Sequence, residues 1–266
     1  MPDGSGSGQD VHCRYYGGGS RNAVFLHCAL SHAGAWKQVA LRLGDRLAVV
    51  APDLPGHGHN PLWTAADGDF HARTTDMVEG LCDGPVDMVG HSVGATVMLR
   101  LALRRPDLCR TLTLVEPVYF AAANGTAEHA RYARLIAPFR AALARGDTVG
   151  AARLFHESWG ALPWSGLTDD QQAEIVMRIH MIEAAEPALS ADVDNVLAPG
   201  RLEALAAPVS LVEGSTSPEI VGAIMRNLAG RLPNVRRALV QGAGHMAPIT
   251  HPEPVAAAIE GNLSRG

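Results

Sequence analysis

Ser92 stands in surroundings that could turn its hydroxyl into a nucleophile. The segment Gly90-His91-Ser92-Val93-Gly94 follows an apolar run at 86–89, and a helix-like pattern starts directly after it. A sharp strand-to-helix turn of this kind pushes the serine hydroxyl into a cleft. Glycine fits positions 90 and 94 because a side chain there would collide with neighbouring backbone. The N-terminus of the following helix would also stabilise negative charge that develops beside Ser92.

His245 is the best candidate for the base that such a serine needs. It lies in Gly242-Ala243-Gly244-His245-Met246, just past the last strand expected in the chain. A general base must come within hydrogen-bond reach of the serine hydroxyl. The chain has 12 histidines, and position singles out this one, because it follows a C-terminal strand and comes after the serine. The other histidines near the motifs are expected to hold loops or line the turn: His27, His57, His59 and His91.

Strands and helices alternate along most of the chain and must position these residues. We expect strands at 24–27, 47–51, 86–89, 111–115, 209–212 and 238–240, and helices at 35–43, 74–82 and 93–104. Such alternation predicts a parallel sheet with helices on both faces and a site at the carboxyl ends of the strands. Between 118 and 199 the alternation stops, and apolar residues recur at helical spacing in 136–143, 149–159 and 175–182. This stretch is predicted to be a helical cap inserted into the core.

The domain organisation that follows is a flexible tail at 1–10, an α/β core formed by 11–117 and 200–266, and the cap at 118–199. The chain has 266 residues, of which 47% are hydrophobic, and this length can bury a sizeable core. Its net charge of −5, without a basic block, argues against a nucleic-acid partner. No apolar stretch is long enough to cross a bilayer, and the N-terminus does not read as a signal peptide.

The sequence thus predicts a cytoplasmic protein that acts on a small molecule, without a membrane or nucleic-acid partner; a homodimer is compatible with it. The four cysteines have no metal-ligand spacing and are expected to be free thiols. They are Cys13, Cys28, Cys82 and Cys109.

Four motifs together resemble those of the α/β-hydrolase superfamily. They are HCAL at 27–30, DLPGHG at 53–58, GHSVG at 90–94 and GAGHM at 242–246. The resemblance extends from about residue 11 to the end of the chain. It implies a mostly parallel, eight-stranded sheet, a helical cap, a Ser–acid–His triad and neither a metal nor an organic cofactor. The backbone amides of Ala29 and Val93 are the candidates for an oxyanion hole, which would stabilise a tetrahedral intermediate.

The sequence departs from the family pattern at two positions. Cys28 stands where the first strand usually ends in His-Gly, and we expect it to be a small packed residue rather than a reactive thiol. Ser217 stands where the family acid usually follows a late strand. An uncharged group there would not stabilise an imidazolium nearly as well as a carboxylate does.

The acid must then come from elsewhere, and three glutamates compete for the role. Glu116 directly follows the strand at 111–115, the position at which some superfamily members carry their acid, and it should emerge near Ser92. Glu213 ends the strand at 209–212, where its side chain would meet a helix or solvent. Glu219 falls in the first turn of the next helix, where a negative charge is favourable in any case. We favour Glu116 and keep the other two open.

The predicted chemistry is acyl transfer through an acyl-enzyme on Ser92, with a largely apolar ester of small to medium size as substrate. A lactone or thioester fits the same residues, and so does cleavage of an amide or a carbon–carbon bond. A ligand-binding or receptor member of the fold with little or no activity is the alternative from another class. The candidate pocket residues are Leu30, His91, Trp159, Trp164, His180 and Met246.

Overall fold

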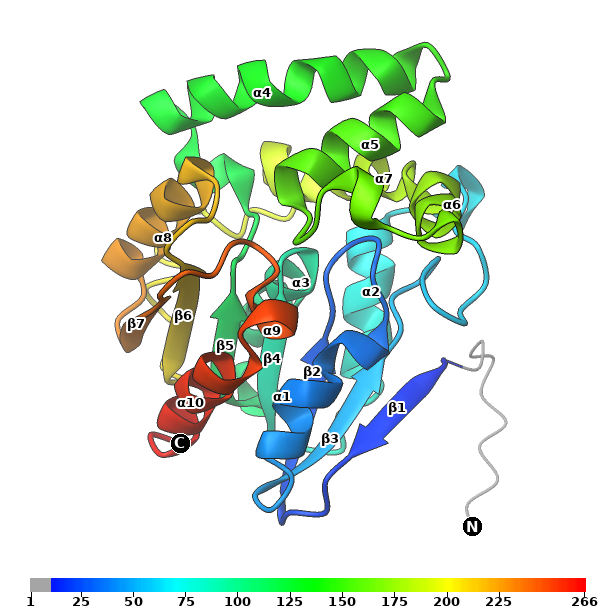
Figure 1. The fold of residues 1–266 in the computed structure, drawn as a ribbon. Helices are drawn as coiled ribbons and strands as arrows, with labels where there is room; N and C mark the ends of the chain where they lie inside the picture. Colours follow the sequence, from blue (N-terminus) through cyan, green and yellow to red (C-terminus); the bar gives the residue numbers. More distant parts are fainter. Residues whose placement is uncertain (1–10) are drawn as a thin grey trace.

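The computed structural model describes residues 11–266 and is built around a seven-stranded sheet in the order β1-β3-β2-β4-β5-β6-β7 (Figure 1). The strands are β1 (Cys13–Tyr16), β2 (Arg21–Leu26), β3 (Leu47–Pro52), β4 (Val86–His91), β5 (Cys109–Val115), β6 (Val209–Gly214) and β7 (Val235–Val240). Only the pairing of β1 with β3 is antiparallel; the other five pairings are parallel. The predicted α/β class and mostly parallel sheet are therefore confirmed.

The sheet differs from the expectation in its number of strands. Residues 11–266 contribute seven strands, whereas the family resemblance implies eight. The six strands expected from apolar runs are all present, and β1 is additional. Its sequence, CRYY, lacks an apolar run because β1 is a short edge strand with no fully buried side chain. The tail predicted at residues 1–10 lies outside the described residues.

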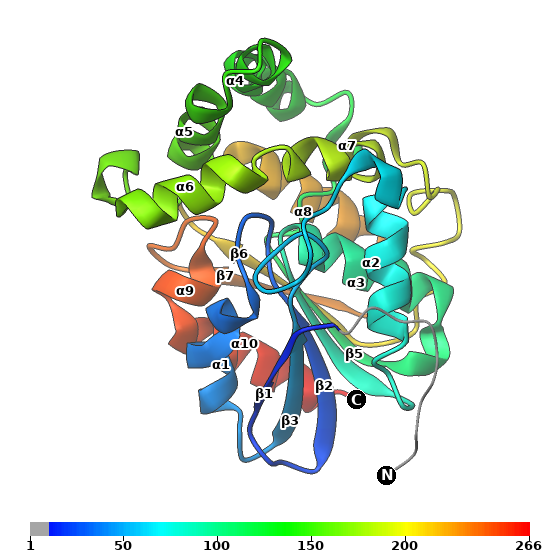
Figure 2. The ribbon, with the colours of Figure 1, turned by 90° about the vertical axis from the view of Figure 1, so that its right-hand side faces the viewer.

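Helices cover both faces of the sheet, as the alternating pattern predicted. One face carries α1 (Lys37–Arg42) and α10 (Pro252–Leu263), with the short α9 (Ala247–Thr250) beside them (Figure 2). The other face carries α2 (Phe70–Glu79), α3 (Val93–Arg104) and α8 (Glu219–Arg231). Three single-turn 3-10 helices lie in the connections of the core: η1 (Ala33–Trp36), η2 (Ala65–Asp67) and η3 (Pro106–Leu108).

Alternate residues of the central strands divide the core into two layers. Met88 and Leu112 belong to the apolar cluster on the α3 side, whereas Val89 and Val115 belong to the cluster on the α1 and α10 side. This is the period of two that a strand requires. Because both faces are covered, the central strands contain nearly continuous apolar runs, which is why they could be recognised in the sequence.

The segment between β5 and β6 is a helical insert, as expected. It contains η4 (Phe120–Ala123), α4 (Ala127–Ala144), α5 (Thr148–Trp159), η5 (Trp164–Gly166), α6 (Asp169–Arg178) and α7 (Met181–Ala191). These helices lie above the carboxyl ends of the parallel strands (Figure 1). Part of the insert packs around a small apolar cluster of its own, which includes Ile136, Phe139 and Ile179. Across residues 11–266, no helix combines the length and the apolar character needed to cross a bilayer.

Candidate active site

Ser92 sits on a strained turn between β4 and α3. Its backbone has φ 56° and ψ −120°, a combination that residues other than glycine rarely adopt. A Cβ at Gly90 would lie 2.4 Å from the carbonyl oxygen of Gly94, and a Cβ at Gly94 would lie 2.5 Å from that of Leu26. The expectation that both glycines are required by close backbone approach is therefore confirmed. Such strain is tolerated where the surroundings fix the turn, and it occurs most often at functional sites.

His245 contacts Ser92, although 153 residues separate them in the chain. The imidazole Nε2 lies 3.0 Å from the Ser92 hydroxyl, within hydrogen-bond distance. Both residues are buried, at 7% and 6% exposure. The loop after β7 and the turn after β4 thus meet at one edge of the sheet, as expected for groups that follow parallel strands.

Glu116 reaches the other nitrogen of the same imidazole. Its Oε2 lies 3.1 Å from Nδ1 of His245, and the carboxyl group is fully buried. Glu116 directly follows β5 and has a positive φ of 52°, which lets its side chain turn from the strand end toward the histidine. The Nδ1–H bond to Glu116 leaves Nε2 free to accept the Ser92 proton. We refer to these three residues as the Ser92–His245–Glu116 cluster.

Two donors fix the second oxygen of the Glu116 carboxylate. The backbone N–H of Gly214 donates to Oε1 at 2.6 Å, and the Ser217 hydroxyl donates to it at 2.8 Å. Ser217, which occupies the position of the usual family acid, therefore contacts the carboxylate rather than the imidazole. The role of Ser217 was missed from the sequence, although its place in the motif was the available signal.

The two competing glutamates lie elsewhere. Glu213 on β6 forms an ion pair with Arg237 at 2.7 Å. Glu219, in the first turn of α8, pairs with Arg131 and is 71% exposed at its side chain. The structure thus brings Glu116, and neither competitor, to His245.

Two further side chains contact His245. Nε2 of the buried His91 donates to the backbone carbonyl of His245 at 2.8 Å. Burial, together with the neighbouring His245, holds the pKa of His91 well below its usual value, so this ring is neutral. From the insert, Trp159 places its indole edge-to-face against His245, with ring centroids 4.5 Å apart. Trp159 therefore shields the cluster from solvent.

The backbone amides of Ala29 and Val93 are the candidates for the oxyanion hole. Neither N–H donates a hydrogen bond to any atom of residues 11–266. The loop that carries Ala29 is fixed by His27, whose Nδ1 donates to the carbonyl of Cys28 and whose Nε2 accepts from the N–H of Leu54. This confirms that His27 holds the loop.

Cys28 is buried beneath this loop, as predicted. Burial raises the pKa of its thiol to about 12, so the group stays protonated near neutral pH. All four cysteines are free thiols, in agreement with the expectation.

A cavity of about 450 Å³ opens above Ser92 and His245. Its walls come from the loop after β2, the loop after β7 and the insert. Most of the lining is apolar: Ala29, Leu30, Phe155, Trp159, Leu162, Leu167, Ile175, Met246 and Ile249. Three charged side chains also line the cavity, and of these Arg178 is paired with Glu174 and donates to the carbonyl of Gly56.

Three of the six predicted pocket residues line this cavity, namely Leu30, Trp159 and Met246. The other three do not line it. His91 is buried beneath the turn. Trp164 packs against His156 within the insert, and His180 turns toward the carbonyl of Trp63. Helical spacing alone could not show which face of each insert helix points at the core.

A second cavity of about 600 Å³ lies against the same loop, and Trp159, His245 and Met246 contribute to both. It is more polar and includes Thr216, Glu157 and His251. A separate group of side chains of types that can ligate a metal, His12, Asp53 and His59, shares no residue with either cavity.

Comparisons with known proteins place this geometry in a family. The family model described as "Alpha/beta hydrolase family" matches residues 23–258. Lipase LipV of Mycobacterium tuberculosis is 36% identical over 112 residues, which cover 41% of this chain and 42% of the lipase. An esterase of the same organism is 34% identical over 106 residues, which cover 38% of this chain and 34% of the esterase. The aligned segments thus span well under half the length of these relatives.

Solved structures share the fold. A putative acyltransferase from Salmonella enterica superimposes with a TM-score of 0.75 at 23% identity, covering 96% of this chain and 91% of the acyltransferase. Since the family model spans nearly the whole sequence and the fold agrees, the chain belongs to the alpha/beta hydrolase family.

Proposed function

We propose that this protein hydrolyses carboxylic esters of small to medium, largely apolar substrates through an acyl-enzyme on Ser92. The observation that carries the proposal is the continuous set of hydrogen bonds from Ser92 through His245 to Glu116, at 3.0 and 3.1 Å. Nucleophile, base and orienting carboxylate lie at the distances that acyl transfer requires.

In the proposed reaction, His245 Nε2 takes the proton of the Ser92 hydroxyl as the oxygen attacks the carbonyl carbon of the ester. The C–O double bond opens to an oxyanion, which the N–H groups of Ala29 and Val93 stabilise. When the intermediate collapses, the imidazolium returns its proton to the departing alkoxide. Water then repeats the sequence on the acyl-enzyme and releases the acid and Ser92.

Glu116 has two functions in this scheme. It fixes the imidazole in the tautomer whose Nε2 accepts a proton, and it stabilises the imidazolium once that proton has arrived. The Gly214 N–H and the Ser217 hydroxyl hold its carboxylate at a fixed angle. A glutamate after β5 thus takes the place of the acid that the family usually carries after a later strand.

The cavity supports an apolar substrate. Most of its lining is aliphatic or aromatic, and two of its three charged side chains, Arg178 and Glu174, are paired with each other. A volume of about 450 Å³ lies in the range of small-molecule sites. The names of the two mycobacterial relatives, a lipase and an esterase, point to the same chemistry.

A fluorophosphonate probe tests the proposal, together with p-nitrophenyl esters of graded acyl length. We expect stoichiometric labelling of wild-type protein on Ser92, no labelling of Ser92→Ala, and turnover that depends on acyl length. Folded wild-type protein that neither reacts with the probe nor turns over any ester would refute the enzymatic proposal. That outcome would support a ligand-binding role, and hydrolysis of amides alone would move the assignment to another bond type.

A further inference from the structure

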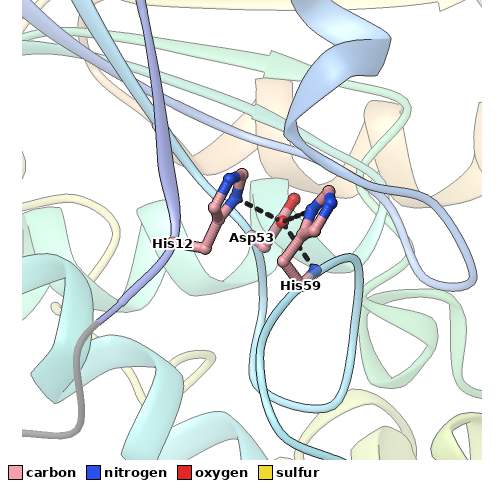
Figure 3. Close-up of side chains that lie close together, drawn as sticks. All are labelled: His12, Asp53 and His59. Carbon is pink, nitrogen blue, oxygen red and sulfur yellow. Dashed lines mark hydrogen bonds and ion pairs between the residues drawn. The ribbon is translucent and has the colours of Figure 1, made fainter.

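Two imidazoles converge on one buried carboxylate away from the Ser92–His245–Glu116 cluster. Nδ1 of His12 lies 2.8 Å from Oδ2 of Asp53, and Nδ1 of His59 lies 3.5 Å from the same oxygen (Figure 3). All three ligand atoms lie within 4.8 Å of one another. His12 precedes β1 in the chain, whereas Asp53 and His59 belong to the loop after β3. The group therefore joins two segments that are distant in sequence.

The carboxylate of Asp53 is held in position by bonds that do not involve the imidazoles. The backbone N–H of Ala33 donates to Oδ1 at 2.6 Å, and the backbone N–H of His59 donates to Oδ2 at 3.0 Å. An anionic oxygen is thus fixed in place at the base of the group.

The backbones that carry the imidazoles are also fixed. The N–H of His12 donates to the Asn60 side chain at 2.9 Å, and the N–H of Asp53 donates to the carbonyl of His12 at 2.9 Å. The His12 and His59 side chains themselves remain open to solvent, at 37% and 66% exposure, whereas that of Asp53 is 1% exposed. Solvent can therefore reach the nitrogens while the carboxylate stays in place.

This combination of ligands suits a borderline divalent ion. Two imidazole nitrogens and one carboxylate oxygen form a ligand set that Zn²⁺ accepts, with water completing the coordination. Bonds of about 2.0–2.1 Å in a tetrahedral site place ligand atoms about 3.3 Å apart. The distances of 2.8 and 3.5 Å to Oδ2 lie on either side of that value. Because backbone donors hold Asp53, the exposed His12 and His59 rings are the groups that adjust on binding, and the Nδ1 proton of His12 must move to Nε2.

We propose that His12, Asp53 and His59 bind one zinc ion, which fastens the segment before β1 to the loop after β3. The role of this ion is structural and separate from the chemistry at Ser92. His59 is adjacent to Gly58, which lines the active-site cavity, so the ion also fixes one wall of that cavity. Without the ion, the same residues form a hydrogen-bonded group.

Zinc affinity of tag-free protein, measured by competition with a fluorescent chelator, tests the proposal. We expect wild-type protein to bind one zinc per chain, and His12→Ala and His59→Ala each to weaken binding by at least about tenfold. His129→Ala, which removes a histidine from α4, serves as the matched control and should bind as wild type does. His245→Ala should also bind normally, which locates the ion away from the active site.

Thermal unfolding provides a readout independent of affinity. Zinc at about a hundredfold excess over its dissociation constant should raise the melting temperature of wild-type protein by about 5 °C, and that of His59→Ala by at most about half as much. Equal melting temperatures of the variants in chelator would show that they are folded. The proposal would be overturned if wild-type protein bound zinc no more tightly than the His12→Ala/His59→Ala double variant. It would also be overturned if His129→Ala lost as much zinc affinity as His12→Ala or His59→Ala.

Discussion

Replacing Glu116 by glutamine tests the site most directly, because the structure fixes how the new amide must lie. Oε1 of Glu116 accepts from the Gly214 N–H and the Ser217 hydroxyl, so the amide oxygen must occupy that position. The amide NH₂ then faces Nδ1 of His245 and donates to it. The opposite orientation would set the NH₂ against the Gly214 N–H across a gap of 2.6 Å.

The consequence for His245 is a change of tautomer. When Nδ1 accepts a hydrogen bond, the ring proton resides on Nε2, and Nε2 can no longer accept the proton of Ser92. The variant also loses the negative charge that stabilises the imidazolium. A substitution of this type costs about 10⁴-fold in kcat in a serine hydrolase, or about 5 kcal/mol of transition-state stabilisation. We expect Glu116→Gln to lower kcat by about 10³–10⁴-fold, with the melting temperature close to that of wild type.

The assay is hydrolysis of the best p-nitrophenyl ester, with fluorophosphonate labelling as a single-turnover check. Glu213→Gln is the matched control, because it makes the same change on β6, where the side chain pairs with Arg237. Its kcat should stay within about twofold of wild type, because Glu213 pairs with Arg237 and not with His245. If Glu116→Gln keeps its kcat within tenfold of wild type, or if Glu213→Gln is the variant that loses activity, the assignment of Glu116 is wrong.

Three further predictions concern the surroundings of the cluster. Ser217→Ala removes one of two donors to the Glu116 carboxylate and should lower kcat by about tenfold in the same ester assay, since a hydrogen bond to a charged group is worth about 1.5–3 kcal/mol. An unchanged kcat would show that the Gly214 amide alone is sufficient to hold the carboxylate. Gly94→Ala places a Cβ 2.5 Å from backbone oxygens at the end of β2 and should lower the free energy of unfolding in urea by about 1–3 kcal/mol. Gly230→Ala on α8 is the control: its Cβ would have no neighbouring atom within 4 Å, so the variant should be as stable as wild type or more stable. Cys28, whose pKa burial raises to about 12, should resist iodoacetamide in native protein at pH 8 when followed by intact mass, and rapid modification would contradict its burial.

Local sequence was sufficient for much of the fold and for two residues of the cluster. The central strands and α3 are covered on both sides, so their apolar runs and periodicity are strong, and the turn at Ser92 is fixed by glycines at set positions. The edge strand β1 escaped recognition because one-sided burial leaves a weak pattern. His245 could be selected by its position after a late strand, which is a property of chain order.

Tertiary structure decided what chain order could not. Three glutamates were compatible with the sequence, and the parallel register of β5 with β6 selects Glu116 by bringing Gly214 and Ser217 to its carboxylate. Chain order likewise did not predict the contact between His12 and Asp53. The patterns of the insert helices show that one face of each helix is buried, but they do not show which elements cover that face. Periodicity indicates which side chains are buried. The residues against which they pack depend on contacts between segments that are distant in the chain.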